Sequence, residues 1–198
     1  MDHELYFSLD VETLGLLGPV TSVGYCVGQP TDTGKTRIVE EGVFWRKPTR
    51  SELDLVSDQD VEWWAQNTPD FVTGTFPSLP EPIQCPDIET VYDQFWSAWA
   101  RRVGEARMIC DVPWPGESRF LLGVLDRQIQ KGRVAARGGA PYPILDVATV
   151  RYCAGLNPIA VEDRLSTELP RHHPLADARQ SLRLFLEALE AINQRRPR

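Results

Sequence analysis

The chain has 198 residues, of which 42% are hydrophobic and 25% are charged, as is ordinary for a soluble globular protein. No apolar run approaches the ~20 residues of a membrane span, and the formal net charge of −7 argues against nucleic-acid binding by simple electrostatic attraction. At this length we expect one domain over residues 1–198. We expect it to be cytoplasmic, because the acidic N-terminus runs directly into a predicted strand and does not resemble a signal peptide.

The first predicted element is a strand within residues 5–15 that carries two carboxylates near its end. Side chains alternate along a strand, so Asp10 and Glu12 share one face. The opposite face is apolar and is predicted to be buried: Leu5, Phe7, Leu9 and Val11. Two acids this close repel each other unless something offsets their charge, and Mg²⁺ or Mn²⁺ does so because both prefer carboxylate oxygens. The pair therefore indicates either a metal site or an exposed acidic strand end.

Two further strands are predicted at residues 20–28 and 36–45. The short connections favour an antiparallel meander at the start of a mixed sheet. Residues 33–36 read Thr-Gly-Lys-Thr, like the end of a phosphate-binding loop, but Gln29 stands where that loop needs a glycine. We interpret this segment as a hairpin turn.

Residues 51–67 carry a helix signal, in which residues 57–60 offer N-caps. A second helix is predicted at residues 88–102, with a Pro-rich loop at residues 73–86 between them. Trp63 and Trp64 lie about 100° apart on the first helix, so one is expected to be buried and the other to lie near the surface. Packing in the core is the favoured role for the pair, and stacking on a base is the alternative. The four cysteines have no Cys-x-x-Cys spacing and are expected to be reduced and mostly buried.

A buried strand at residues 107–110 is predicted to end at Asp111, and a helix at residues 117–131 begins with Glu117. Basic residues outnumber acidic ones between residues 101 and 137, which indicates either a phosphate-binding surface or a solvated helix face. Asp146 is predicted to cap a helix.

A last helix is predicted over residues 174–194 from its apolar stripe. Asp177 lies in its first turn, where the helix dipole favours a carboxylate. His172 lies five residues earlier on the entering loop. A metal-suited carboxylate and a titratable imidazole are therefore expected near one helix start.

Asp10-Val11-Glu12-Thr13, with His172-His173-Pro174-Leu175-Ala176-Asp177 near the C-terminus, resembles the DEDDh branch of the DEDD exonuclease superfamily. That branch has Asp-x-Glu-Thr and His-x-Ala-x-x-Asp motifs, and Pro174 stands where it has alanine. The order and separation of the motifs fit over nearly the whole chain, and the paired tryptophans resemble one bacterial and phage branch. The resemblance implies an α/β fold of the ribonuclease H-like type, a mixed sheet with its first three strands antiparallel and helices flanking it.

By the same resemblance, Asp10 would bridge two ions of Mg²⁺ or Mn²⁺, and Glu12 and Asp177 would complete one site. A third carboxylate would serve the other ion, and two residues remain open for this role. Asp111 has the family's residue type at a strand end, whereas Glu117 has the family's register at a helix start.

His172 is the implied general base, with His173 as the competing candidate. Thr13 and Leu14 are implied to lie beside the terminal nucleotide. Homodimers are common among relatives, but no feature of this sequence sets the oligomeric state.

The implied activity is metal-dependent 3′–5′ exonucleolytic hydrolysis of single-stranded DNA or RNA from its 3′ end, releasing nucleoside monophosphates. Other classes stay open: a nucleic-acid-binding module that has lost catalysis, a phosphodiesterase limited to very short oligonucleotides, and a proofreading subunit bound to a polymerase. Nothing in the sequence separates DNA from RNA, because that depends on contacts to the 2′-OH.

Overall fold

The computed structural model describes residues 4–74, 76, 80–133, 139–159 and 172–195. Its centre is a six-stranded mixed sheet in the order β4-β3-β2-β1-β5-β6. Antiparallel pairing joins β1 (Leu5–Thr13), β2 (Val20–Pro30) and β3 (Thr36–Trp45). Parallel pairing adds β4 (Ile83–Gln84), β5 (Ala106–Cys110) and β6 (Ile144–Asp146). The predicted antiparallel meander is therefore confirmed.

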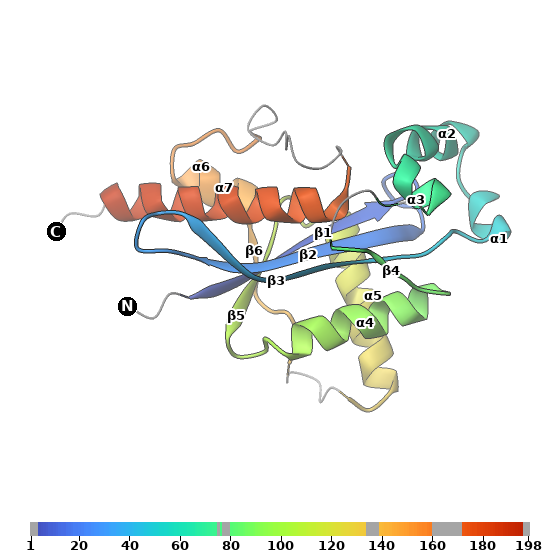
Figure 1. The fold of residues 1–198 in the computed structure, drawn as a ribbon, viewed down its shortest axis with the longest axis horizontal. Helices are drawn as coiled ribbons and strands as arrows, with labels where there is room; N and C mark the ends of the chain where they lie inside the picture. The colour runs from blue at the N-terminus through green and yellow to red at the C-terminus, as the bar shows by residue number, and fades with distance from the viewer. Residues whose placement is uncertain (1–3, 75, 77–79, 134–138, 160–171, 196–198) are drawn as a thin grey trace.

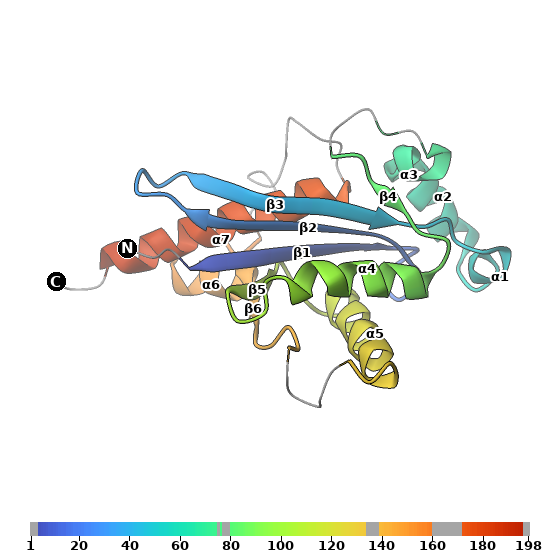
Figure 2. The same ribbon diagram turned by 60° about the horizontal axis from the view of Figure 1, so that its bottom comes forward.

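Helices cover both faces of the sheet (Figures 1 and 2). One face packs against α4 (Ile88–Ala100) and α5 (Gly116–Gln130), and the other against α7 (Pro174–Arg195). The remaining helices are α1 (Arg50–Leu53), α2 (Asp58–Asn67), α3 (Pro69–Thr73) and α6 (Val147–Cys153). The predicted α/β class is confirmed, and the layout is consistent with a ribonuclease H-like fold.

The alternation of side chains along β1 divides the core into two parts. Phe7 and Leu9 belong to the core beneath α4 and α5. Tyr6 belongs to the core beneath α7, where its ring centroid lies 4.8 Å from that of Phe185. Asp10 and Glu12 lie four and six residues after Tyr6 on the same strand. Their side chains therefore point to the same side of the sheet as that of Tyr6, which is the α7 side.

Gly24 allows α7 to approach the sheet closely. It pairs with Asp10 across the β1–β2 ladder, and a Cβ atom at this position would lie only 2.2 Å from the backbone carbon of Pro174. Any side chain here would therefore push the start of α7 away from the strand. The absence of one brings the first turn of α7 next to the carboxylate end of β1.

Two predicted segments differ from the structure. The helix expected at residues 51–67 is split, because Thr49 caps α1 and Ser57 starts a new helix by accepting a hydrogen bond from the backbone N–H of Asp60. The loop expected at residues 73–86 contains the short strand β4, which pairs with the end of β3. The polar connection predicted at residues 161–169 lies outside the described residues.

The predictions for the thiols and for Asp146 are confirmed. Cys26, Cys85 and Cys110 are buried and Cys153 is exposed, all as free thiols. Asp146 caps α6 by accepting a hydrogen bond from the backbone N–H of Ala148.

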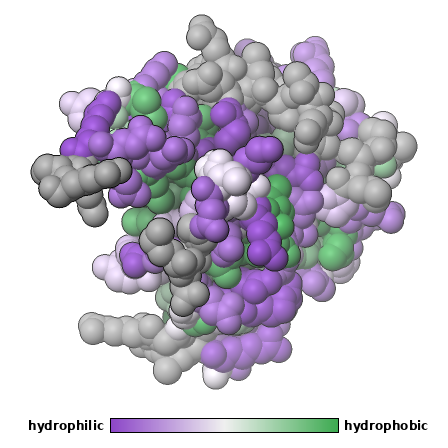
Figure 3. All heavy atoms as spheres, turned by 60° about the vertical axis from the view of Figure 1, so that its left-hand side comes forward, coloured by the Kyte–Doolittle hydropathy of each residue, from purple (hydrophilic) through white to green (hydrophobic). Residues whose placement is uncertain are grey.

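On the side of the molecule shown in Figure 3, hydrophilic residues predominate and hydrophobic ones occupy small separate areas. Within the described part of the chain, no helix combines the length and the apolar character needed to cross a membrane, α7 included.

Candidate metal centre and adjoining cavity

The end of β1 and the start of α7 bring three potential metal ligands together. Glu12, His172 and Asp177 each offer one ligand atom, and these atoms all lie within 4.8 Å of one another. The Nδ1 atom of His172 lies 3.8 Å from Oε1 of Glu12. Residues at opposite ends of the chain thus meet in one cluster, which we call the candidate centre.

Local backbone geometry sets the position of each member. Glu12 precedes an irregularity in the β1–β2 ladder, and its carbonyl oxygen accepts a hydrogen bond from Oγ1 of Thr21 at 3.2 Å. Asp177 lies in the first turn of α7, where its N–H donates to the carbonyl of His173 at 3.1 Å. His172 has a φ of 59°, a left-handed conformation that is uncommon outside glycine. The ring therefore projects from a bend in the chain rather than from the helix.

Negative charge accumulates around Glu12. Its side chain is only 13% exposed. Burial, followed by the nearby carboxylates of Asp177 and Glu117, raises its pKa from 4.5 to about 8. A divalent cation would offset this repulsion, and the donor set of two carboxylates and one imidazole is suited to one. The residues present therefore fit a metal such as Mg²⁺ or Mn²⁺.

Asp10 lies next to this cluster but is not part of the three-residue group. It is partly buried and lies on the same face of β1 as Glu12. Burial raises the pKa of the Cys110 thiol well above its usual value, and the charges of Glu117, Asp10, Asp146 and Asp111 add to that shift. Acidic residues from β1, β5, β6 and α5 thus share one region at the sheet end.

The two candidates for the third carboxylate have different surroundings. Glu117, in the first turn of α5, is close enough to Glu12 for its charge to raise the pKa of Glu12. Asp111 is buried directly after β5, and its charge acts on Cys110. Glu117 is therefore electrostatically coupled to Glu12 of the candidate centre.

The two residues implied to contact a nucleotide lie at the end of β1 and just after it. Thr13 donates through Oγ1 to the carbonyl of Gly15 at 2.6 Å. The side chain of Leu14 is 0% exposed and packs in the core beneath α7. A ligand at this turn would meet the backbone of Leu14 rather than its side chain.

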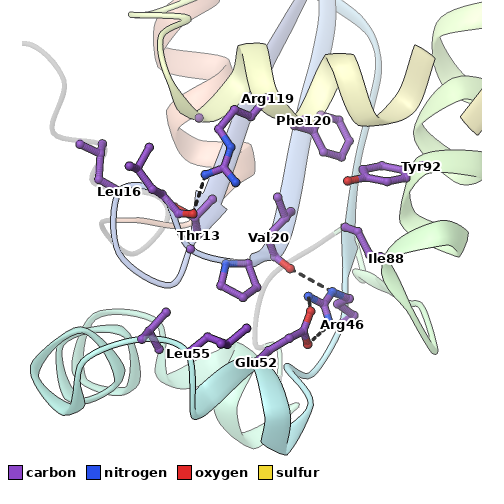
Figure 4. A pocket seen from close by; sticks show the side chains of 15 residues that line it. Thr13, Leu16, Val20, Arg46, Glu52, Leu55, Ile88, Tyr92, Arg119 and Phe120 are labelled. Carbon is purple, nitrogen blue, oxygen red and sulfur yellow. Dashed lines mark hydrogen bonds and ion pairs between the residues drawn. The ribbon is translucent and has the colours of Figure 1, made fainter. Parts of the chain in front are cut away.

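A cavity of about 440 Å³ lies at the turn after β1, on the side of the sheet covered by α4 and α5. Thr13 and Gly116 line it, and these are the chain neighbours of Glu12 and Glu117. Figure 4 shows Tyr92 and Phe120 on one side of it and the turn after β1 on the other. Its size falls within the ~300–1,000 Å³ of typical small-molecule sites.

Two arginines line the cavity with different partners. Arg46 makes a bidentate ion pair with Glu52, at 2.6 and 2.7 Å, and donates to the carbonyl of Val20 (Figure 4). Arg119 reaches from α5 to the carbonyl of Leu17, on the exposed turn after β1. The cavity is thus lined by apolar side chains, by the Arg46–Glu52 ion pair and by Arg119.

Much of the basic stretch predicted to hold phosphates is occupied by acids instead. Arg101 and Arg102 both bind Glu40, and Arg127 and Lys131 both bind Asp93. The solvated-face interpretation therefore fits these residues better than phosphate binding does.

The two neighbouring histidines have different environments. His172 is 28% exposed and belongs to the candidate centre. His173 is buried with its ring centroid 5.5 Å from that of Phe71, and burial lowers its pKa. His173 is therefore a core residue, whereas the side chain of His172 is partly accessible.

The sequence did not indicate one neighbour of this centre. Trp63 of α2 contacts His172 with ring centroids 4.9 Å apart and an interplanar angle of 72°. The paired tryptophans indicated that one ring would be near the surface, but they gave no sign of this partner.

A scan of protein-family models finds none that matches the chain, and a search of curated proteins finds no significant match either.

Proposed function

We propose that this protein is a metal-dependent 3′–5′ exonuclease of the DEDDh type that releases nucleoside monophosphates from single-stranded DNA or RNA. The observation that carries this proposal is the meeting of Glu12, His172 and Asp177 within 4.8 Å. These three residues belong to the two motifs that resemble that branch, and the fold class agrees with it.

In this proposal Asp10, Glu12, Asp177 and Glu117 would hold two ions of Mg²⁺ or Mn²⁺. When bound, the ions would supply electrostatic stabilisation of the attacking and leaving oxygens of the phosphodiester. Glu117 is preferred to Asp111 as the third carboxylate because its charge acts on Glu12.

His172 is proposed as the general base. It accepts a proton from a water molecule as the water oxygen forms a bond to phosphorus and the bond from phosphorus to the 3′ oxygen breaks. The leaving oxygen takes a proton from solvent, which yields a nucleoside 5′-monophosphate and a new 3′ hydroxyl. His172 is preferred to His173 because the imidazole of His173 is buried against Phe71.

The cavity at the turn after β1 is the proposed position of the terminal nucleotide. It begins at Thr13, directly after the metal-binding acids of β1. The apolar side chains in its lining suit a base, and Arg119 donates to the carbonyl of Leu17 on the turn that lines it.

The test uses 5′-labelled single-stranded DNA and RNA, both long and dinucleotide-sized, with Mg²⁺, Mn²⁺ or EDTA. We expect a ladder that shortens from the 3′ end in the presence of metal and disappears with EDTA and in Asp10→Ala and His172→Ala. A positioned base contributes ~10²–10⁴ to rate, so His172→Ala should lose about that factor.

Two results would contradict the proposal. Cleavage of dinucleotides alone would favour a phosphodiesterase for very short substrates. Binding of single strands without any hydrolysis would favour a module that has lost catalysis.

A further inference from the structure

Helix α2 lies at the end of the molecule where β1 finishes and α7 begins (Figure 1). Its two adjacent tryptophans have different environments. Trp64 is 7% exposed and packs in the core beneath α7, whereas Trp63 is 42% exposed. Trp64 thus anchors the helix, and Trp63 is available for another role.

Trp63 packs edge-on against the imidazole of His172. The ring centroids are 4.9 Å apart and the planes are inclined by 72°, which is a favoured arrangement for two aromatic rings. His172 itself has a left-handed backbone conformation and leaves 28% of its side chain exposed. The indole of Trp63 therefore covers one side of a partly exposed imidazole and restricts its rotation.

A second contact ties the same face of α2 to the turn after Glu12. A Cβ atom at Gly15 would lie 2.9 Å from Cγ of Asp60, so the Asp60 side chain rests directly on this glycine. Asp60 and Trp63 are three residues apart and so share one face of the helix. That face touches both the turn that follows Glu12 and the loop residue His172.

We infer that α2 sets the geometry of the candidate centre, with Trp63 as the residue that positions the imidazole of His172. The catalytic consequence rests on the proposed function, in which His172 is the base. Rotation of the ring would move its nitrogen atoms away from Glu12, and a misplacement of about 1 Å can cost roughly 10²-fold in rate.

The kinetic test compares Trp63→Ala and Trp63→Phe with the wild type, using metal-dependent hydrolysis of a labelled single strand. We expect Trp63→Ala to lower kcat by ~10-fold or more, with KM unchanged within about 2-fold, and Trp63→Phe to restore most of the loss. Glu62→Ala is the matched control, because Glu62 is an exposed neighbour on α2 that bonds Gln66, and this variant should behave like the wild type.

The opposite kinetic pattern would overturn the inference. A raised KM with unchanged kcat would mean that Trp63 stacks on a substrate base instead. A loss in Glu62→Ala equal to that in Trp63→Ala would mean that α2 as a whole, rather than the indole, is responsible.

A spectroscopic test does not depend on activity. The chain has three histidines, so the imidazole proton signals of His172 can be assigned with a His172→Ala variant. The indole ring current should shift those signals, and Trp63→Ala should remove the shift while Glu62→Ala keeps it. Unshifted His172 signals would overturn the inference, whereas a wild type without hydrolysis would overturn the proposed function.

Discussion

The charge state of Glu12 depends strongly on its neighbours in the candidate centre. Burial and the carboxylates of Asp177 and Glu117 raise its pKa to about 8. In the absence of a cation, the folded protein therefore holds a proton on Glu12 at a pH where the unfolded chain has released it. This links the stability of the metal-free protein to pH.

The free energy of unfolding of the metal-free protein should contain a contribution from Glu12 that is present below pH 4.5 and is lost as the pH rises through about 8. Glu12→Gln removes this titration. We expect the variant to have the higher thermal midpoint at pH about 8 and a much smaller advantage at pH about 5. Thermal unfolding in EDTA at both pH values measures the difference.

The comparison isolates Glu12, because the buried His173, whose lowered pKa acts in the opposite direction, is common to both proteins. Identical pH dependence in the two proteins would contradict the described charge environment. Saturating Mn²⁺ should reverse the order at high pH, since the cation stabilises the ionised form of Glu12.

The third carboxylate can be identified at the same scale. Glu117→Gln should lower both Mn²⁺ affinity and hydrolysis by ~10²-fold, because its charge acts on the candidate centre. Asp111→Asn should lose less than ~10-fold. Calorimetric titration with Mn²⁺, together with initial rates of hydrolysis, identifies the third carboxylate. A larger loss of Mn²⁺ affinity and hydrolysis in Asp111→Asn than in Glu117→Gln would reverse the assignment.

The sequence motifs named Glu12, His172 and Asp177, and the structure brings these three residues together. The sequence alone did not distinguish Asp111 from Glu117 as the third carboxylate, because the distinction depends on where α5 starts relative to the sheet. It also did not indicate the partner of Trp63. That contact joins helix α2 to a loop residue far away in the chain, and no local periodicity reports it.

At the scale of elements, the approach of α7 to β2 places Asp177. Gly24 and Pro174 are in such close contact that an added Cβ would lie 2.2 Å from backbone atoms. Neither backbone can yield easily, because Gly24 is in an inner strand and Pro174 begins a long helix. The ligand set therefore depends on a residue that carries no side chain.

Gly24→Ala should lower the free energy of unfolding by about 1–3 kcal/mol or more through overpacking. It should also weaken Mn²⁺ binding in the protein that still folds, because α7 must move. Gly116→Ala is the control for stability, since a Cβ at that helix start would meet nothing within 4 Å. Urea unfolding of both variants measures the effect, and equal stability would show that α7 tolerates the shift.

Element prediction succeeded where side-chain pattern dominates, and it offered Ser57 as an N-cap without separating α1 from α2. Strand β3 has the predicted bounds, and the apolar stripe of α7 predicted its length to within one residue. The helix expected at residues 51–67 is broken because Ser57 accepts from the backbone of Asp60, a local bond that competes with helix continuation. The two-residue strand β4 exists through its pairing with β3 and has no sequence pattern of its own.

At the scale of the whole molecule, the candidate centre and the helices beside it lie at one end of the sheet. Figure 1 shows that the arrowhead of β1, the first turn of α7 and helices α1 to α3 lie together there. The overall charge of −7 is compatible with a nucleic-acid substrate if divalent cations occupy the acidic cluster, because bound ions are then the largest local charges. Ion pairs occupy much of the basic stretch elsewhere, so the cations rather than a basic surface would attract phosphate.

The most direct measurement is a paired titration and hydrolysis assay of wild type and Asp177→Asn with Mn²⁺. We predict that the wild type binds Mn²⁺ and shortens a 5′-labelled single strand from its 3′ end. Asp177→Asn should lose both properties by ~10²-fold or more while retaining its fold. Equal Mn²⁺ affinity and equal hydrolysis in the two proteins would contradict the claim that Glu12, His172 and Asp177 form one catalytic metal centre.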